Sequence, residues 1–419
     1  VPGLRRDALI GGIKYYDGQV DDARHTMTVA RTAAAYGAVV RTSTQVIGFL
    51  KESDRVSGVR VRDVETGQET EVKARVVINS TGVWTDEIQR LSGGRGRFKV
   101  RASKGVHLVV ARDRITSESG IILKTEKSVL FVIPWKSHWI IGTTDTDWNL
   151  DLAHPAATRA DIDYILEHVN KVLAVPLTHD DIEGVYAGLR PLLAGESEQS
   201  SKLSREHAVA RVAPGLVAIA GGKYTTYRVM GADAVDAAAE DLPGRINPSC
   251  TDEVPLVGAL GYQALVNQAD RLAAQHGVHP YRIKHLLNRY GAEIHELLAP
   301  AADDPSLLEP IPGAPDYLRA EALYAVTHEG ALHVEDVLAR RTRISIEYAH
   351  RGTESMQCVA DIMASVLGWT AAQAAREVEA YQARVDAERR SQTEPDDTSA
   401  EKARLEAPEV RDLATSPVA

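Results

Sequence analysis

The chain has 419 residues, of which 44% are hydrophobic and 25% charged, and its formal net charge at pH 7 is -10. This composition is typical of soluble globular proteins, and the length predicts two or more domains. The excess of acidic residues argues against broad binding to nucleic acid, although it leaves room for a local basic pocket. Only Cys250 and Cys358 occur, with no Cys-x-x-Cys pair, which favours a reducing, cytoplasmic location.

The start of the chain, VPGLRRDALIGG, lacks the apolar region of a signal peptide. No apolar run approaches the ~18 to 20 residues that a membrane span needs. The sequence also begins without Met and in the middle of a pattern, which we interpret as an N-terminal truncation.

The N-terminal part of the sequence predicts mixed α/β structure. Residues 26–36 form an Ala-rich helical pattern, and an alternating β pattern follows over 38–51. A hairpin around the turn ETGQE leads into a more buried strand that ends at Thr81-Gly82. Thr85 is placed to cap a short helix after that strand.

The middle of the sequence predicts a sheet with one working face. Four β-patterned runs lie between residues 99 and 145, separated by charged or Gly-containing turns. A helical pattern follows in RADIDYILEHVNKVL, and three further strands are expected near IEGVYAGLRPLL, SREHAVARV and LVAIAGG. From about Tyr262 the pattern becomes helical throughout, which predicts a separate α-helical domain. After about Ser391 the sequence is polar and low in aromatic residues, so we expect a disordered tail there.

Several familiar motifs are absent from the sequence. Val217 stands where a phosphate-binding P-loop needs a glycine ahead of Gly222-Lys223. The run GRG at 94–96 lacks the third glycine of a dinucleotide-binding fingerprint. The 14 histidines show no ligand spacing, so we predict no metal site.

The run LVAIAGGKYTTYRVMG (residues 216–231) combines a strand and a helix across two glycines. The strand is expected to end on Gly221-Gly222 and the helix to begin near Thr225. Such a turn lets a flat ligand approach the backbone, and the free N–H groups of the helix and Lys223 present positive charge to it. This arrangement suits an electron-accepting ring such as a flavin. On physical grounds alone, an ordinary strand-to-helix corner is the more frequent explanation.

Three other positions carry candidate chemistry. Arg190 precedes a proline in AGLRPLL, Arg205 lies in LSREH, and His107 interrupts the apolar strand KGVHLVV. Two arginines and a lysine commonly hold a phosphate, and a histidine can take a proton near neutral pH. Each residue also has an ordinary alternative: Arg190 in a structural ion pair, Arg205 on a solvated face and His107 satisfied in the core.

Seven sequence runs occur in an order that is typical of one family. The runs are YYDGQVDDAR, VVINSTGVWTD, LFVIPW, IIGTTDT, AGLRPLL, AIAGGKYTTYR and VEDVLARRTR. Through them the chain resembles the FAD-dependent glycerol-3-phosphate dehydrogenases over about residues 1–390. The related amino-acid oxidases and the glycine or sarcosine oxidases share the fold but lack IGTTDT and the helical domain with ARRTR.

The resemblance implies an α/β plus α architecture. It consists of an FAD-binding Rossmann-like domain of the glutathione-reductase or amino-acid-oxidase type, a mixed-sheet substrate domain and a C-terminal α-helical domain. The family's first βαβ unit, with its Gly-x-Gly-x-x-Gly turn, is not in this sequence. The expected division is 1–98 for the remainder of the FAD-binding domain, 99–212 for the substrate domain, 213–243 for a return to the FAD-binding domain, 244–254 for a linker, 255–390 for the helical domain and 391–419 for a disordered tail.

The resemblance also implies a reaction and a site. Family members oxidise sn-glycerol 3-phosphate to dihydroxyacetone phosphate, with hydride transfer to FAD and onward electron transfer to a quinone. His107 and Arg190 should lie at the C2 hydroxyl of the substrate, and both are candidates for the base, with His107 favoured to take the hydroxyl proton and Arg190 to assist it. Arg205 should lie near the phosphate, and Lys223 near both flavin and substrate. The cofactor-binding positions implied are Val46, Thr81, Gly82, Gly221, Gly222, Lys223, Tyr224, Thr225 and Thr226.

Further partners and rival functions follow from the same resemblance. A peripheral contact with the cytoplasmic face of a membrane and a homodimer are both compatible with it. One rival is a glycerol-3-phosphate oxidase that uses oxygen as the acceptor. Another is a catalytically incompetent fragment, or a regulatory partner whose helical domain is the working part.

Overall fold

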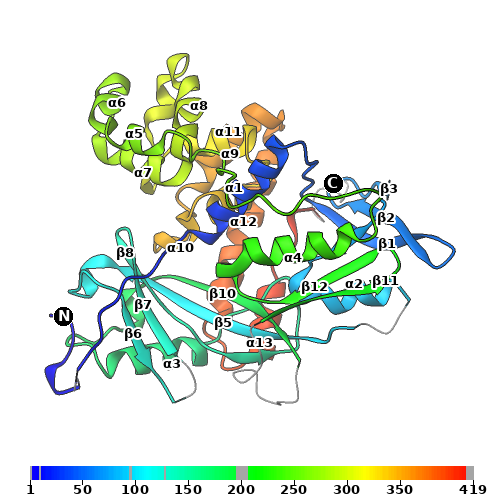
Figure 1. Cartoon of the computed structure of the whole chain (residues 1–419). Coiled ribbons are helices and arrows are strands. Elements are labelled where there is room, and N and C mark those ends of the chain that lie inside the picture. The colour runs from blue at the N-terminus through cyan, green and yellow to red at the C-terminus, as the bar shows by residue number, and fades with distance from the viewer. Residues whose placement is uncertain (1, 9–10, 94–96, 127–128, 195–205, 412–419) are drawn as a thin grey trace.

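The computed structural model describes residues 2–8, 11–93, 97–126, 129–194 and 206–411. Figure 1 shows a large sheet at the lower left, a smaller α/β part at the right and a helical part at the top. The chain leaves the α/β part for the large sheet and later returns to it, so that strands far apart in the sequence pair there. The helical part follows in the second half of the chain, in green to red.

The N-terminal helix and a three-stranded meander begin the α/β part. Helix α1 (Asp22–Ala35) starts at Asp21, whose side chain accepts a hydrogen bond from the backbone N–H of Arg24. The meander is antiparallel in the order β1-β2-β3. Its strands are β1 (Thr44–Glu52), β2 (Arg55–Asp63) and β3 (Glu69–Lys73).

A second three-stranded sheet joins two distant stretches of sequence. Strand β12 (Leu216–Gly221) pairs in parallel with β4 (Val77–Asn79) and antiparallel with β11 (His207–Ala213). Each parallel strand leads into a short 3₁₀ turn and then a helix. The turn η2 (Gly82–Trp84) precedes α2 (Thr85–Leu91), and η6 (Tyr224–Thr226) precedes α4 (Tyr227–Ala239).

Thr85 does not occupy the capping position that the sequence predicts for it. The residue before α2 is Trp84, and Thr85 is the first residue of the helix itself. Its hydroxyl donates to the carbonyl of Gly82 at 2.7 Å, so the side chain ties the helix back to the preceding turn. The difference arises because the 3₁₀ turn uses residues that the sequence assigns to the loop.

The large sheet is antiparallel and has two distinct faces. Its strands are β10 (Ile182–Leu193), β5 (Val100–Ala111), β8 (His138–Gly142), β7 (Val129–Trp135) and β6 (Ile121–Lys124) in that order, with β9 (Thr146–Trp148) also paired to β5. Val106, Leu108 and Val110 of β5 pack into one core with helix α3 (Arg159–Asn170). Because side chains alternate along a strand, His107 and its neighbours two residues away point to the opposite face.

The helical part is built on two apolar cores, one around the earlier helices and one around the later ones. A small hairpin of β13 (Pro310–Ile311) and β14 (Ala314–Leu318) and a π-helical segment, η10 (Asp336–Arg341), interrupt the helices. Within the described ranges, no helix is long and apolar enough to cross a membrane. The helices are α5 (Tyr262–Val266), α6 (Ala269–His276), α7 (Pro280–Tyr290), α8 (Ile294–Leu298), α9 (Arg319–Thr327), α10 (Ile344–Glu347), α11 (Met356–Leu367), α12 (Ala371–Ser391) and α13 (Asp397–Leu405).

The segment after Ser391, which the sequence predicts to be a disordered tail, contains helix α13. Asp396 caps this helix through the backbone N–H of Ser399 at 2.9 Å. Asp397 pairs with Lys104, which is completely buried on β5. Polar composition is a poor guide here, because the helix is held by its ion pair with the buried Lys104 and by Ala400, which packs with Trp148 and Ala156. Residues 412–419 lie outside the described ranges.

A buried ion pair connects the two halves of the chain. The guanidinium of Arg24 on α1 donates to both carboxylate oxygens of Glu329, which follows α9, at 2.7 Å each. The side chains are 8% and 0% exposed, so water does not screen the pair. Because the pair is bidentate, it fixes the direction of α1 relative to the helical part.

Replacement of Arg24 by methionine should lower the free energy of unfolding by about 3 to 5 kcal/mol, because Glu329 would be left buried and unpaired. The matched control is Arg62→Met, which breaks the exposed Arg62–Glu69 pair at 2.8 Å. That control should cost about 0 to 1 kcal/mol. Urea unfolding followed by far-UV circular dichroism measures both. Equal losses in the two variants would contradict the assignment of α1 to a buried junction.

Candidate functional site

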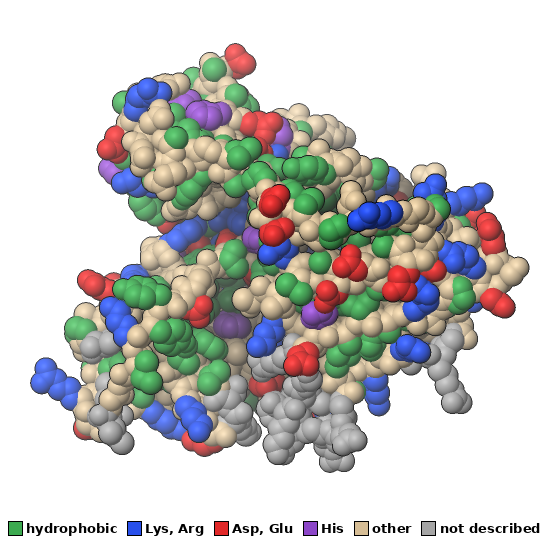
Figure 2. All heavy atoms as spheres, viewed as in Figure 1, with side chains coloured by type: hydrophobic (Ala, Val, Ile, Leu, Met, Phe, Trp, Pro, Cys, Tyr) green, Lys and Arg blue, Asp and Glu red, His purple; other side chains and the backbone are tan. Residues whose placement is uncertain are grey.

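Two strands of the large sheet bring His107 and Arg190 to the same face. In the pairing of β5 with β10, His107 lies opposite Tyr186 and Arg190 lies opposite Ser103. The rings of His107 and Tyr186 are stacked, with centroids 4.9 Å apart and planes inclined by 11°. In the space-filling view the surface is hollowed between the sheet and the helical part, with basic side chains in blue and purple inside (Figure 2). The predicted working face of the sheet therefore carries both candidate catalytic residues.

Two glycines make room for these side chains. A Cβ atom at Gly142 would lie 2.3 Å from Cδ2 of His107. A Cβ atom at Gly105 would lie 2.4 Å from Nη2 of Arg190. Both distances are too short for non-bonded atoms. A side chain at either glycine would therefore displace His107 or Arg190 from its position against the sheet.

Two threonines position Arg190, and sequence reasoning gave them no role. Nη2 of Arg190 donates to the hydroxyl of Thr143 at 2.8 Å, and Nη1 donates to the carbonyl of Thr144 at 3.3 Å. The hydroxyl of Thr144 in turn accepts from the backbone N–H of Val106 at 3.0 Å. In the sequence, IGTTDT carries only the family resemblance; the signal for this function is its two adjacent hydroxyl groups next to a strand end.

The surroundings of His107 keep its imidazole neutral. Burial, together with the nearby positive charge of Arg190, lowers the pKa of His107 to about 4. Its Nδ1 atom is buried and has no hydrogen-bond partner among the described residues. A neutral imidazole has one unprotonated ring nitrogen, which can act as a proton acceptor.

The Gly221-Gly222 turn has the shape that the sequence predicts. Both residues lie in the left-handed region, with φ of +76° and +91°. A Cβ atom at Gly221 would lie 2.6 Å from the carbonyl oxygen of Glu206, so the turn admits only glycine there. Neither η6 nor α4 receives a side-chain cap, although the backbone N–H groups of Gly222 and Thr226 donate to the carbonyls of Glu206 and Lys223. Regular α-helix begins at Tyr227, two residues later than the sequence predicts.

Lys223 and Tyr224 extend from this turn. Lys223 is exposed and occupies the position before η6. The hydroxyl of Tyr224 lies 2.7 Å from Nδ1 of His25 and 3.0 Å from the hydroxyl of Thr26, both on α1. These contacts connect the glycine turn to the start of α1. Thr225 and Thr226 are exposed within η6.

The parallel pairing of β12 with β4 brings a second glycine turn to the same edge. Ala218 of β12 lies opposite Asn79 of β4, so the carboxyl ends of the two strands point the same way. Thr81 and Gly82 follow β4, and Gly82 has a φ of +59° with open space where a Cβ atom would be. Ligands of open α/β sheets bind at this end of the strands. The turn η2 also contacts β5 and β10, the strands of His107 and Arg190.

One predicted site residue lies apart from the others, and another is outside the described residues. Val46 lies on β1, in the meander rather than in the sheet of β4 and β12. Arg205 lies outside the described residues. Across the ranges that the structure describes, no group of three or more His, Cys, Asp or Glu side chains is arranged to hold a metal ion.

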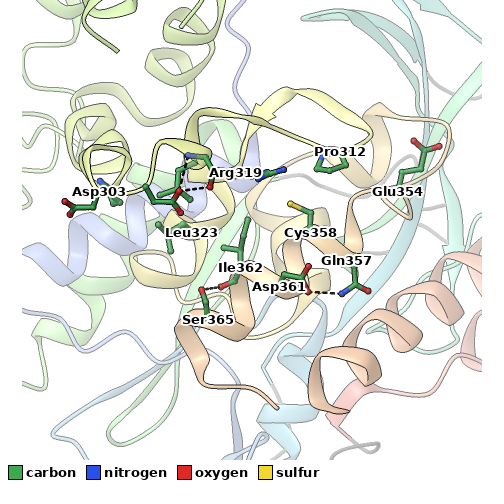
Figure 3. Close-up of a pocket in the computed structure, with 14 residues that line it drawn as sticks. Asp303, Pro312, Arg319, Leu323, Glu354, Gln357, Cys358, Asp361, Ile362 and Ser365 are labelled. Atoms are coloured by element: carbon green, nitrogen blue, oxygen red, sulfur yellow. Dashed lines mark hydrogen bonds between the residues drawn. The ribbon is translucent and has the colours of Figure 1, made fainter. Parts of the chain in front are cut away.

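A cavity of about 710 Å³ lies elsewhere, in the helical part (Figure 3). Cys358 and Arg319 face it together with several carboxylates. The amide of Gln357 donates to Asp361 at 2.9 Å within the lining. Burial raises the pKa of Cys358, so its thiol is a poor nucleophile at neutral pH. The lining residues thus offer no counterpart to the His107 and Arg190 arrangement.

The family models that match the chain divide it at about the same place as the fold. The model described as FAD dependent oxidoreductase matches residues 1–228. The model described as C-terminal domain of alpha-glycerophosphate oxidase matches residues 249–374. The first covers the large sheet and the α/β part, and the second covers most of the helical part.

Individual proteins are similar over most of the chain. Glycerol-3-phosphate dehydrogenase 2 of Mycobacterium tuberculosis is 68% identical over 417 residues, which are 100% of this chain and 71% of the relative. Glycerol-3-phosphate dehydrogenase of Mycobacterium leprae is 67% identical over the same shares. The crystal structure of glycerol-3-phosphate dehydrogenase from Bacillus halodurans complexed with FAD is 30% identical. It superposes with a TM-score of 0.80 and covers 92% of this chain and 77% of the solved one.

Two histidines of the large sheet should have pKa values shifted in opposite directions, with that of His107 below and that of His138 above the ordinary value for histidine. His107 should stay neutral down to about pH 5, because burial and Arg190 disfavour its charged form. Burial also opposes the charge of His138, yet the Glu183 carboxylate at 2.9 Å raises the pKa of His138 above its usual value. At pH 6 we expect neutral His107 and protonated His138.

NMR titration of histidine-labelled protein measures both pKa values, and His107→Gln and His138→Gln spectra assign the signals.

The lowered pKa of His107 in the folded protein also makes the free energy of unfolding depend on pH. Since unfolding frees its imidazole to bind a proton, His107 contributes stability that is present above about pH 6.5 and declines as the pH falls toward 4. A His107 signal that titrates at its ordinary value would contradict the described environment.

Proposed function

The chain belongs to the FAD-dependent glycerol-3-phosphate dehydrogenases, and from that premise we propose that His107 and Arg190 carry out the oxidation of glycerol 3-phosphate on the face of the large sheet. The protein is an FAD enzyme that oxidises glycerol 3-phosphate. The observation that carries the residue assignment is the shared face: a neutral imidazole and a fixed guanidinium lie on neighbouring strands beside a glycine turn.

The residues at the sheet edge fit a flavin. Gly82 has open space where a Cβ atom would be, and Gly221 forms a tight turn in which a Cβ atom would clash with Glu206. The uncapped N–H groups at η6 and the charge of Lys223 give this edge a positive potential. When bound there, FAD supplies the acceptor for the hydride that leaves C2 of the substrate. Thr81, Tyr224, Thr225 and Thr226 complete the proposed lining, and Val46 stays a proposal for the adenosine half.

His107 is proposed to take the proton of the C2 hydroxyl. Loss of a hydride from C2 leaves a hydroxyl whose proton must go to a base, and a neutral imidazole provides one. Burial holds His107 neutral, and the stacked Tyr186 ring fixes its plane. Arg190 lies close enough to Gly105 and Thr143 that its guanidinium is held against the sheet. From there it can stabilise the developing oxyanion.

The phosphate of the substrate is proposed to bind to cations. Arg190 and Lys223 supply two positive charges at the described part of the site, and Arg205 is proposed as a third. Arginine binds phosphate through two parallel hydrogen bonds, whereas lysine acts as a point charge. The overall charge of -10 makes this local excess of cations selective for a small anion rather than for a polyanion.

We propose a quinone as the electron acceptor. The relatives of 67% and 68% identity carry the name dehydrogenase, which favours an acceptor other than oxygen. A quinone dissolved in a bilayer would require the enzyme to contact the membrane surface from the cytoplasmic side. The oxygen-dependent alternative gains support only from the name of the helical family model.

His107→Gln should lower the rate of glycerol-3-phosphate oxidation by roughly 100-fold to 10,000-fold, because the C2 proton loses its acceptor. Dye reduction with glycerol 3-phosphate measures this, and flavin absorbance confirms that the variant holds FAD. The same assay with a quinone analogue, or with oxygen and peroxide detection, identifies the acceptor. His107→Gln with full turnover would overturn the proposed role, and peroxide as the main product would overturn the quinone.

Gly221→Ala should weaken FAD binding at least about tenfold, a loss of ~1.4 kcal/mol. The reason is that φ of +76° and a Cβ contact of 2.6 Å with Glu206 would force the turn to move. The matched control is Gly231→Ala inside α4, where a Cβ atom meets nothing within 4 Å. Flavin retained per chain after dialysis measures both. Full retention in Gly221→Ala would argue against a flavin at this edge.

A further inference from the structure

Tyr186 lies between the candidate base and the helical part of the chain. One face of its ring stacks on His107, with centroids 4.9 Å apart. The same side chain packs against the apolar cluster of Val109, Trp135 and Ile140, to which Ile346 of α10 also belongs. Tyr186 thus contacts the site directly and shares an apolar cluster with Ile346 of the second domain.

We propose that Tyr186 is a positioning residue for the reaction: its ring holds the imidazole of His107 in the plane needed for proton transfer, and α10 holds Tyr186 in place. The inference rests on the proposed role of His107 as base. The helical part then contributes to the reaction by positioning Tyr186, whose ring stacks on His107.

The anchoring of β10 to α10 is unusually close. A Cβ atom at Gly184 would lie 2.0 Å from the carbonyl oxygen of Ile346, so the strand and α10 touch through their backbones. Gly184 is two residues before Tyr186, on the same side of the strand. A movement of α10 would therefore displace the strand that carries Tyr186.

Helix α10 is in turn fixed to the sheet by a buried carboxylate. Glu347 accepts from Nε1 of Trp135 on β7 at 2.7 Å and from the hydroxyl of Tyr317 on β14 at 2.7 Å. Its side chain is buried, so both bonds are shielded from water. The positions of β7, β10 and β14 are consequently coupled through Glu347 and Ile346.

The ring of Tyr186, rather than its hydroxyl, makes the contact with His107. No hydrogen bond joins that hydroxyl to another of the described residues. Burial raises the pKa of Tyr186, so the phenol stays protonated and is not itself a proton acceptor. The charged groups that act on Tyr186 are Asp22, Arg343 and Asp21, and the charged group that acts on His107 is Arg190.

The test compares Tyr186→Phe with Tyr186→Leu in the FAD-loaded enzyme. Anaerobic stopped-flow measurement of flavin reduction by glycerol 3-phosphate isolates the chemical step from acceptor turnover. Tyr186→Leu should slow this step about 10-fold to 100-fold with unchanged substrate affinity, because misorientation of a base costs rate rather than binding. Tyr186→Phe keeps the ring and should restore the rate.

A second readout does not depend on activity. In Tyr186→Leu, loss of the stacked ring admits water to His107, so NMR titration should show its pKa rising toward the ordinary value. Tyr186→Phe should leave the titration of His107 unchanged. The matched control is Tyr164→Leu, which removes another half-buried tyrosine in ring contact with a histidine, His168 on α3. That control should leave both readouts unchanged.

Three results would overturn the inference. They are an unchanged rate and titration in Tyr186→Leu, an equal loss in Tyr186→Phe, and an equal loss in Tyr164→Leu. If Tyr186→Leu does not fold, Tyr186→Met replaces it under the same criteria. A His107→Gln enzyme with full turnover would instead refute the proposed base, and the NMR titration would still decide whether Tyr186 controls the surroundings of His107.

Discussion

The pairing of β5 with β10 is the constraint on which the site depends. It places Tyr186 opposite His107 and Arg190 opposite Ser103 along one continuous antiparallel ladder. Because side chains alternate, a slip of one residue would turn His107 into the apolar core and expose Val106 or Leu108 instead. The core formed with α3 therefore sets the register, and the register sets the site.

The other parts of the fold surround this ladder from different sides. The loop after β8 brings Thr143 and Thr144 against Arg190 from one direction. The helical part reaches it from another, through the backbone contact between Gly184 and Ile346. Neither contact is local in sequence. The site is therefore a property of the whole chain, and changes in the second half can alter chemistry that is performed in the first.

The strands and the glycine turn were predictable because their signals are local. Alternation of apolar residues gave the strands of the large sheet, and Gly221-Gly222 before Lys223 gave a turn that only glycine can form. The resemblance to a family, which the comparisons confirm, supplied the cofactor and the reaction. The register of β5 and β10 puts His107 and Arg190 on one face of the sheet, and their roles in the reaction stay proposals.

Other features depend on contacts that a single sequence does not reveal. The hydroxyl of Thr143 acquires its role only when the chain brings Arg190 to it across 47 residues. Helix α13 lies in a polar segment that resembles a disordered tail, and its partner Lys104 is 293 residues away. The stacking of Tyr186 on His107 likewise needs the register of two strands. In each case the deciding interaction is non-local, and periodicity carries little information about such contacts.

Lys104 has a consequence for how the sequence can vary. It follows Ser103 on β5, and its ammonium group is shared between Asp161 of α3 at 2.6 Å and Asp397 of α13. Replacing any one of these three residues by an uncharged residue would leave the remaining charges without their partner, which is costly where they are buried. Related sequences should therefore exchange these three positions as a set, and an alignment of homologues should show them covarying. Relatives that keep all three residues should also have helix α13 packed against β5, however polar their C-terminal segments are.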